Sequence, residues 1–350
     1  MSIKMAIIGM GNMAGWHYKL IKERIPGLIV TGGYDIQKEA RDKASEWGIT
    51  NYNSPTELYE DKNIDLVLVA TPNDKHKEYS INCLLAGKHV VCEKPVTLNA
   101  AELEEIIVAS EKSGKIFTIN QNRRWDKDYL IIRKILSDGL LNNPYNIESR
   151  VQGSRRPWGW RAFKQNGGGM LLDWGVHLLD QILDLIPQKV VSVYGHLHKI
   201  SNGDVDDCLT TLLRFENGCT AEVNVSTNCF ITQPRWHLSC EDGTAVIKDW
   251  ELGGSIVKLV NPKIMDWEDA IVYTSAGPTH TMIPRPKETT QELQLPETSG
   301  DWSNFYLNIV DAINGKAKPI VTATQALRVM NVIDAIFESD LSGAAITTHI

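Results

Sequence analysis

The sequence predicts an α/β domain with a doubly wound, mostly parallel sheet, followed by an α+β domain with a large open, mostly antiparallel sheet. Short apolar strands alternate with amphipathic helices up to about residue 120, and strand-like runs separated by turn residues dominate the second half. A single hydrophobic core seldom grows beyond about 250 residues, so a chain of 350 residues can hold two domains. We expect the first domain to span residues 1–121 and the second residues 122–350.

The first half is predicted from its alternating pattern. Strands are expected over Ile3–Ile8, Leu28–Tyr34, Ile64–Ala70, His89–Cys92 and Ile116–Asn120, with helices over Met13–Arg24, Gln37–Trp47 and about Asp74–Ala86. The third of these strands has the β-branched character of a central parallel strand. A further helix starts after Asn99, where Glu102 three residues on completes a capping box.

The second half is predicted from strands and turns. Strands are expected over Val190–His198, Leu209–Phe215, Thr220–Thr227, Arg235–Cys240 and Ala245–Asp249, and helices over about Lys127–Asp138, Trp302–Ile313 and Thr324–Phe337. Asn217-Gly218 and Asp242-Gly243 are hairpin signals. Residues 277–300 are rich in Pro and Thr and predict a long irregular loop. The second face of such an open sheet is generally covered by another element or chain. The sequence therefore predicts a homodimer or homotetramer that forms through this face.

Composition excludes several classes of protein. The formal net charge of −7 and the pI near 5.8 argue against a nucleic-acid partner. No apolar run approaches the roughly 20 residues that span a bilayer, and no signal peptide precedes the first strand. The six cysteines include no Cys-x-x-Cys pair, which is typical of a reduced cytoplasmic protein. Four of them recur at similar spacing, but strand packing explains them better, and we expect no metal site.

The turn after the first strand indicates a dinucleotide site. It contains Gly9-Met10-Gly11-Asn12-Met13-Ala14 and opens a helix. The first glycine permits the tight turn and the second lets a pyrophosphate approach the backbone at the helix N-terminus. The small Ala14 allows close packing of helix on strand. The first domain is therefore expected to be a Rossmann domain.

Asp35 ends the second strand, near where a carboxylate binds the adenine ribose hydroxyls in this fold. Ile36 and Gln37 offer no Arg or Ser for a 2′-phosphate, so the sequence predicts NAD rather than NADP. The alternative is that Asp35 only caps the following helix. Thr71-Pro72-Asn73 follows a parallel strand and is predicted to contact the cofactor at the carboxyl edge of the sheet.

The sequence predicts an acid/base pair on a helix whose other side chains are mostly apolar. Asp173 and His177 lie four positions apart on an apolar helix that follows Gly167-Gly168-Gly169, so they should project from one face. Lys94, in Glu93-Lys94-Pro95, comes after a strand at the carboxyl edge. Its ammonium can lower the pKa of a bound hydroxyl. A solvated surface lysine is the alternative.

Together, the dinucleotide loop, Ala70–Asn73, Glu93–Pro95 and the Gly168–His177 segment resemble the glucose–fructose oxidoreductase/inositol dehydrogenase (Gfo/Idh/MocA) family. The resemblance implies that Lys94 hydrogen-bonds the substrate hydroxyl, that Asp173 binds substrate, and that His177 takes the hydroxyl proton as hydride passes to nicotinamide. It implies that Glu93 and Pro95, the latter after a cis peptide, shape the nicotinamide pocket.

The resemblance also covers residues after the first domain. It places Asn122 and Arg123 at the substrate, whereas Arg124 is better explained as a salt bridge that holds the domains together. Residues 155–161 form an aromatic and cationic loop, in which Trp158 is predicted to contact substrate and Trp160 and Arg161 cofactor. An interface is the alternative for this loop.

Six other histidines lack a carboxylate at useful spacing and are expected at surface or core positions: His17, His76, His89, His196, His198 and His237. His76 is nevertheless also expected near the nicotinamide.

These features predict an NAD-dependent oxidoreductase that moves a hydride between nicotinamide and a secondary alcohol of a sugar, cyclitol or glycoside. One alternative is a glycoside-cleaving hydrolase or lyase that uses tightly bound NAD for transient oxidation. The other is a non-catalytic NAD-binding regulator, whose expected mark is loss of Lys94 or His177. Both residues are present.

Overall fold

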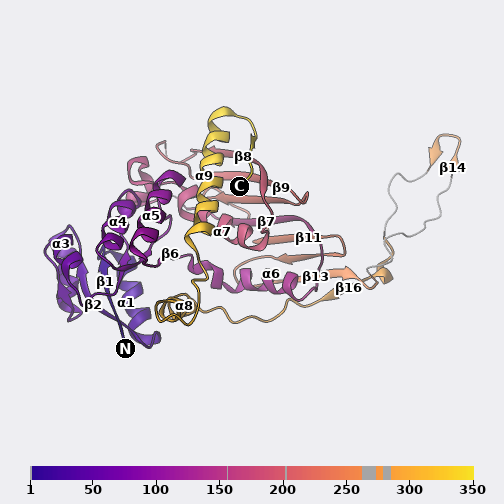
Figure 1. Cartoon of the computed structure of the whole chain (residues 1–350). Helices are drawn as coiled ribbons and strands as arrows, with labels where there is room; N and C mark the ends of the chain where they lie inside the picture. Colours follow the sequence, from indigo (N-terminus) through magenta and orange to yellow (C-terminus); the bar gives the residue numbers. More distant parts are fainter. Residues whose placement is uncertain (1, 156, 202, 262–272, 279–284) are drawn as a thin grey trace.

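The computed structural model describes residues 2–155, 157–201, 203–261, 273–278 and 285–350. It contains a six-stranded parallel sheet near the N-terminus and a nine-stranded sheet after it (Figure 1). The predicted fold class is confirmed.

The first sheet has the strand order β3-β2-β1-β4-β5-β6, the doubly wound order of Rossmann domains. Its strands are β1 (Ile3–Ile8), β2 (Leu28–Tyr34), β3 (Thr50–Asn51), β4 (Leu66–Val69), β5 (His89–Cys92) and β6 (Phe117–Ile119). Helices α1 (Asn12–Arg24), α2 (Lys38–Glu46), α3 (Pro55–Glu60), α4 (His76–Leu85) and α5 (Ala100–Ser113) connect them, with a 3-10 turn, η1 (Asn73–Lys75), before α4. All four residues of β4 are buried, as expected for a central parallel strand.

The second sheet has the order β16-β13-β12-β11-β7-β10-β9-β8-β17. Its strands are β7 (Pro144–Gln152), β8 (Val190–His198), β9 (Cys208–Phe215), β10 (Thr220–Ser226), β11 (Trp236–Cys240), β12 (Gly243–Ile247), β13 (Gly254–Leu259), β16 (Thr290–Leu293) and β17 (Ile346–Thr347). Both predicted hairpins, β9–β10 and β11–β12, are present. The pair β7–β10 is parallel.

The prediction of an irregular loop over 277–300 is wrong in part. Within that range β16 pairs with β13 and extends the sheet, and the 3-10 turn η6 (Lys287–Thr289) precedes it. Strands β14 (Tyr273–Thr274) and β15 (Gly277–Pro278) form a separate hairpin. Residues 279–284 of the predicted loop lie outside the described residues.

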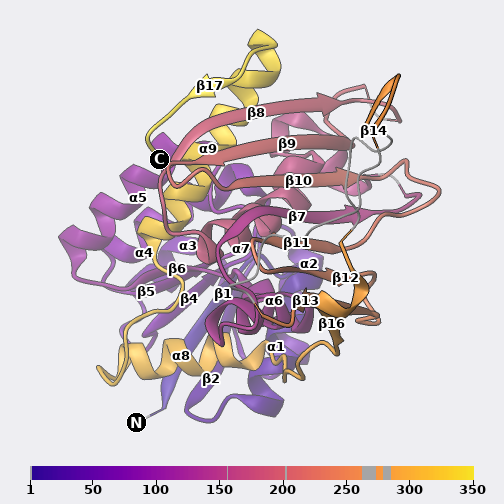
Figure 2. The same cartoon turned by 90° about the vertical axis from the view of Figure 1, so that its right-hand side faces the viewer.

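The described helices cover only one face of the second sheet. Figure 2 shows β8, β9, β10, β7 and β11 in front, with α7 (Val176–Leu185) and α9 (Ala323–Ser342) behind them. Helix α6 (Lys127–Ser137) also belongs to this domain. On the face without helices, Tyr194 and Leu212 are cross-strand partners that are 41% and 46% exposed.

The last two helices return to the N-terminal sheet. Helix α8 (Ser303–Ile313) packs beside α1, and α9 contacts α5 (Figure 1). The hydroxyl of Thr118 in β6 donates to the carbonyl of Val321, and the amide of Ala100 donates to Asp334 in α9. Thus residues distant in sequence build the region between the two sheets.

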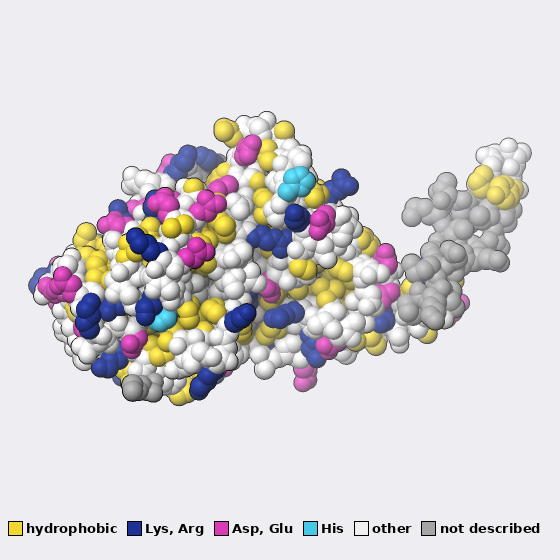
Figure 3. All heavy atoms as spheres, viewed as in Figure 1, with side chains coloured by type: hydrophobic (Ala, Val, Ile, Leu, Met, Phe, Trp, Pro, Cys, Tyr) yellow, Lys and Arg dark blue, Asp and Glu magenta, His cyan; other side chains and the backbone are white. Residues whose placement is uncertain are grey.

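The surface shown in Figure 3 carries Lys and Arg side chains interspersed with Asp and Glu. In the described residues, no helix is long and apolar enough to cross a membrane.

Candidate active site

The glycine turn after β1 has the shape that a dinucleotide requires. Gly9 has a φ of +95°, and a Cβ there would lie 2.5 Å from the carbonyl oxygen of Ala70. A Cβ at Gly11 would meet nothing within 4 Å, so the backbone faces open space. The first turn of α1, which begins at Asn12 and Met13, has no side-chain cap and no acidic residue. These features fit a pyrophosphate at the positive end of the helix.

Asp35, directly after β2, is hydrogen-bonded to this turn. Its Oδ2 accepts a hydrogen bond from the amide of Met10 at 2.8 Å, and its Oδ1 accepts one from the amide of Gln37 at 2.9 Å. Two cations of α2 lie close by: Arg41 Nη1 donates to the carbonyl of Asp35, and Lys43 Nζ donates to the carbonyl of Met10. The sequence prediction considered only the residues directly after Asp35 and missed both.

The predicted cofactor residues after β4 have different surroundings. The buried Oγ1 of Thr71 has no hydrogen-bond partner among the described residues, which fits a ligand contact at this edge. Pro72 is exposed beside it. Asn73 is buried, and its Nδ2 donates to the carbonyl of Gly167 at 2.8 Å, which joins the two domains.

His76 does not reach a ligand site. It is fully buried, with Nδ1 2.8 Å from the carbonyl oxygen of Pro95 and Nε2 2.9 Å from that of Thr71. The prediction that it contacts the cofactor is wrong, because packing leaves no surface for such a contact. Burial lowers the pKa of His76, so the ring is neutral and donates through one nitrogen. It therefore donates to only one of these two carbonyls and packs between the loops that carry Thr71 and Pro95.

Lys94 reaches across from the first domain to the second. The Lys94–Pro95 peptide bond is cis, as predicted. The Nζ atom of Lys94 donates to Asp173 twice, to Oδ1 at 2.8 Å and to the carbonyl oxygen at 2.9 Å. Both side chains are largely buried, at 15% and 20% exposure. The alternative of a solvated surface lysine is wrong.

Glu93 lies at the centre of a buried polar network. Its Oε1 accepts from Asn120 Nδ2 and contacts His17 Nε2, each at 2.7 Å, and its Oε2 accepts from the amide of Lys94 at 3.1 Å. Burial alone would raise the pKa of Glu93, but the bond and charge of His17 and the bond from Asn120 outweigh it and lower the pKa to about 2. Glu93 is therefore an anion that fixes the Lys94 backbone.

His17 connects this network to the C-terminal part of the chain. The hydroxyl of Tyr306, in α8, lies 2.8 Å from His17 Nδ1. Burial raises the pKa of Tyr306 well above its usual value, so the phenol keeps its proton. The two ring nitrogens of His17 thus join this neutral hydroxyl to the Glu93 carboxylate. The sequence offered no carboxylate partner for His17 because Glu93 is 76 residues away.

Asp173 lies in a π-helical turn, η5 (Leu171–Gly175), that precedes α7. The turn starts where Asp206 Oδ2 accepts from the amide of Leu171 at 2.7 Å. Gly169 must be glycine here, because a Cβ would lie 2.1 Å from Asp206. Burial would raise the pKa of Asp173, but Lys94 and Arg161 outweigh it and lower the pKa. Such π-turns occur frequently at functional sites.

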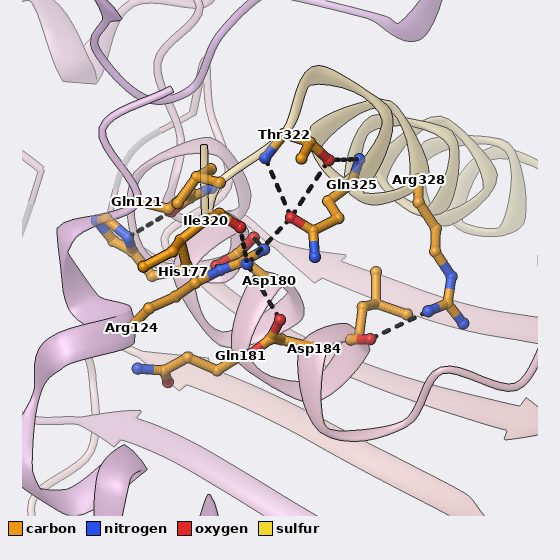
Figure 4. A network of polar contacts seen from close by, with 12 residues as sticks. Gln121, Arg124, His177, Asp180, Gln181, Asp184, Ile320, Thr322, Gln325 and Arg328 are labelled. Atoms are coloured by element: carbon orange, nitrogen blue, oxygen red, sulfur yellow. Dashed lines mark hydrogen bonds and ion pairs between the residues drawn. The ribbon is translucent and has the colours of Figure 1, made fainter. Parts of the chain in front are cut away.

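His177 is directed at a different partner. Its Nδ1 lies 3.0 Å from Oε1 of Gln121, at the end of β6 (Figure 4). Burial, followed by the charges of Lys94, Arg123 and Arg235, lowers the pKa of His177 well below its usual value. The ring is neutral, and it donates from Nδ1 to the amide oxygen, which leaves Nε2 as a proton acceptor. Among the described residues, Asp173 bonds Lys94 and Arg161, and no hydrogen bond joins it to His177.

A cavity of about 690 Å³ opens beside Asp173. Its walls include Arg123, whose guanidinium lies 4.1 Å from the ring centre of Trp174 and 5.9 Å from that of Trp250. Trp158 lines the same cavity and is 85% exposed. Asn122 is buried beside Arg123 and does not line it.

The aromatic and cationic loop reaches Asp173. Arg161 Nε donates to Asp173 Oδ1 at 3.2 Å, and the guanidinium stacks 4.5 Å from the ring centre of Trp160. Arg156 of this loop lies outside the described residues. Cofactor contact by Trp160 and Arg161 stays a prediction.

Arg124 joins segments within the second domain, whereas the sequence predicted a salt bridge that holds the two domains together. It forms two 2.7 Å bonds to the Asp180 carboxylate and one of 3.0 Å to Asp184, both in α7 (Figure 4). It also donates to Gln325 in α9. This buried guanidinium fixes α7, and with it His177, against the last helix.

The cysteines and the acidic and imidazole side chains form no metal centre among the residues that the structure describes. All six cysteines are free thiols. Cys83 and Cys92 are fully buried.

Comparison with known proteins finds a family match for both parts of the chain. Residues 3–121 match the oxidoreductase family with an NAD-binding Rossmann fold, and residues 129–246 match the GFO/IDH/MocA C-terminal domain. The crystal structure of an NAD-binding protein from Listeria innocua is 40% identical, with a TM-score of 0.91 and 99% of each chain covered.

Two curated relatives come from Bacillus subtilis. The scyllo-inositol 2-dehydrogenase (NAD(+)) is 31% identical over 64% of this chain and 67% of its own length. The scyllo-inositol 2-dehydrogenase (NADP(+)) is 28% identical over 81% of this chain and 78% of its own length. The matches of both domains show that the chain belongs to the Gfo/Idh/MocA family of NAD-binding oxidoreductases.

Proposed function

We propose that this protein moves a hydride between nicotinamide and a secondary alcohol of a sugar, cyclitol or glycoside. The observation that carries the proposal is the 2.8 Å contact between Lys94 Nζ and Asp173 Oδ1, with the neutral, buried His177 four residues further on. Relatives named as inositol dehydrogenases support the substrate class.

In the proposed reaction, His177 is the base. Its Nδ1–H is held by Gln121, and its Nε2 lone pair accepts the hydroxyl proton as the adjoining carbon loses hydride. Lys94 donates a hydrogen bond to the same hydroxyl and stabilises the negative charge that develops on its oxygen. Asp173 holds the Lys94 ammonium in place and accepts from a neighbouring hydroxyl. In the reverse direction, protonated His177 returns the proton.

The cofactor proposal is NAD, which supplies the hydride acceptor when bound. Gly11 and the uncapped first turn of α1 would hold the pyrophosphate, and Asp35 the adenine ribose. A 2′-phosphate would lie beside the Asp35 carboxylate, which disfavours NADP. Arg41 and Lys43 reduce this repulsion, so we expect a preference for NAD and not complete exclusion of NADP.

We also propose that two or four copies associate through the face of the second sheet that carries Tyr194 and Leu212. In the part of the chain that the structure describes, no helix lies over that face, and these apolar neighbours are 41% and 46% exposed. Burying them against a second copy would remove this apolar surface from water.

The experiment screens sugars, cyclitols and glycosides with NAD by absorbance of the reduced cofactor, and then compares variants on the best substrate. Lys94→Ala and His177→Ala should each lower turnover by about 10² or more, because general acid–base help is typically worth that much. NAD binding, measured by calorimetry, should change little. Lys62→Ala, at an exposed position, is the control. Unchanged turnover in both site variants would refute the proposed mechanism.

A further inference from the structure

The cavity beside Asp173 is rich in positive charge. Three of its lining residues are arginines, Arg123, Arg155 and Arg161, and Asp173 is the acidic residue among them. The whole chain has a formal net charge of −7, so this local excess of cations runs against the average. A neutral polyol needs hydroxyl donors and acceptors, and it does not require such a charge.

Two cationic side chains already bind the carboxylate of Asp173. Its Oδ1 accepts from both Lys94 at 2.8 Å and Arg161 at 3.2 Å. Arg123 is bonded to Asp126 at 2.8 Å and stacks on Trp174, so its position is fixed. Arg123 and Arg161 are thus each paired with a carboxylate, and one arginine position of the cavity is left.

That position is Arg155. Its backbone amide donates to the carbonyl of Thr227 at 2.8 Å, which anchors the residue at the cavity wall. Its guanidinium is exposed and has no hydrogen bond or ion pair with any described residue. An arginine fork is well suited to bind a carboxylate or phosphate through two parallel hydrogen bonds.

We infer that the substrate of this site is an anionic polyol, a sugar or cyclitol that carries a carboxylate or a phosphate group. The anionic group binds Arg155, and the apolar face of the ring packs on Trp174 and Trp250. The cavity volume of about 690 Å³ leaves room for such a substituent, because it lies within the range of about 300–1,000 Å³ typical of small-molecule sites. This inference rests on the proposed function.

A second observation agrees with the charge of the site. The charges of Lys94 and Arg123 contribute, after burial, to lowering the pKa of His177. A positive field therefore extends from the cavity to the reacting centre, and an anionic substrate enters that field favourably.

The test is calorimetric binding to the NAD-saturated enzyme, with glucuronate, glucose 6-phosphate, glucose and myo-inositol as probes. At least one anionic probe should bind tenfold or more tightly than glucose, and the difference should shrink as salt is added. Tight binding of glucuronate alone identifies a carboxylate, and tight binding of glucose 6-phosphate alone a phosphate. Equal or tighter binding of the neutral probes, or no binding of either anion, would overturn the inference.

Arg155→Gln should weaken binding of the preferred anion by about tenfold, since a hydrogen bond to a charged group is lost, and should weaken glucose binding much less. Arg133→Gln, at an exposed position on α6, makes the same change in net charge and should keep the preference. An equal loss for all probes in Arg155→Gln would contradict a charge-specific role. If neutral sugars are oxidised and Lys94→Ala stops that oxidation, the proposed function stands even where the anion preference fails.

Discussion

Replacing His17 with Leu should disturb the active site from a position that touches neither substrate nor cofactor. The variant removes the N–H group that His17 Nε2 directs at Glu93 Oε1 over 2.7 Å. Glu93 would keep Asn120 and the amide of Lys94 as partners, but it would remain a buried anion with one bond fewer. We therefore expect a loss of stability together with a looser position of Lys94.

The size of the effect follows from the pKa of Glu93. A carboxyl with a pKa of about 2 in the folded protein and 4.5 when unfolded contributes about 3 kcal/mol of stability at pH 7, at about 1.4 kcal/mol per pH unit. This contribution is complete above pH 4.5 and is lost as the pH falls towards 2. Loss of one hydrogen bond to a charged group should remove about 1.5–3 kcal/mol of it. The pKa of Glu93 should rise correspondingly, and acid unfolding should begin at a higher pH.

The assay combines urea unfolding at pH 7, the midpoint of acid unfolding, and steady-state kinetics. His17→Leu should lower kcat more than it changes the KM for NAD, because Lys94 is displaced while the dinucleotide turn is not. His17→Gln, whose amide can donate to Glu93, should recover part of the loss. Ile21→Val, on the buried side of the same helix, is the control: it should cost about 1 kcal/mol and leave kcat and the acid midpoint unchanged. The reasoning is refuted if His17→Leu behaves like this control.

Three further predictions test other contacts. Gln121→Glu should raise the pKa of His177, since a charged hydrogen bond exceeds a neutral one by about 1 kcal/mol. The acid limb of kcat/KM should therefore move upward by about one pH unit relative to the wild type. Asp35→Ala should weaken NAD and improve relative NADP binding, measured by calorimetry; an unchanged ratio would contradict the ribose assignment. Leu212→Glu should reduce the mass seen by light scattering towards 39.2 kDa, whereas Leu341→Glu, on exposed α9 surface, should not.

The sequence predicted those features that depend on local spacing. The hairpins at Asn217-Gly218 and Asp242-Gly243 were predictable because their turn residues require particular backbone angles. The glycine turn before α1 was predictable for the same reason. Strand β7 was missed because polar side chains alternate along it and a proline begins it, although it lies at the centre of the sheet.

Contacts between distant segments had no local signal. His17 and Glu93 are 76 residues apart, and Gln121 and His177 are 56 apart. The residue types gave no hint either, because a histidine inside an amphipathic helix and a glutamine after a strand are common in any protein. The π-turn at Asp173 was predicted as ordinary α-helix, since the apolar residues around it fit a helix of either kind.

Three hydrogen bonds of the site join the two domains. Lys94 bonds Asp173, Asn73 bonds Gly167, and Gln121 bonds His177. In each pair the first residue lies at the carboxyl edge of the N-terminal sheet and the second on the segment from Gly167 to His177. The groups of the proposed reaction are therefore in place only when the second domain is packed on the first. Because α8 and α9 return to α1 and α5, the end of the chain fixes that packing, and Tyr306 extends it to Glu93 through His17.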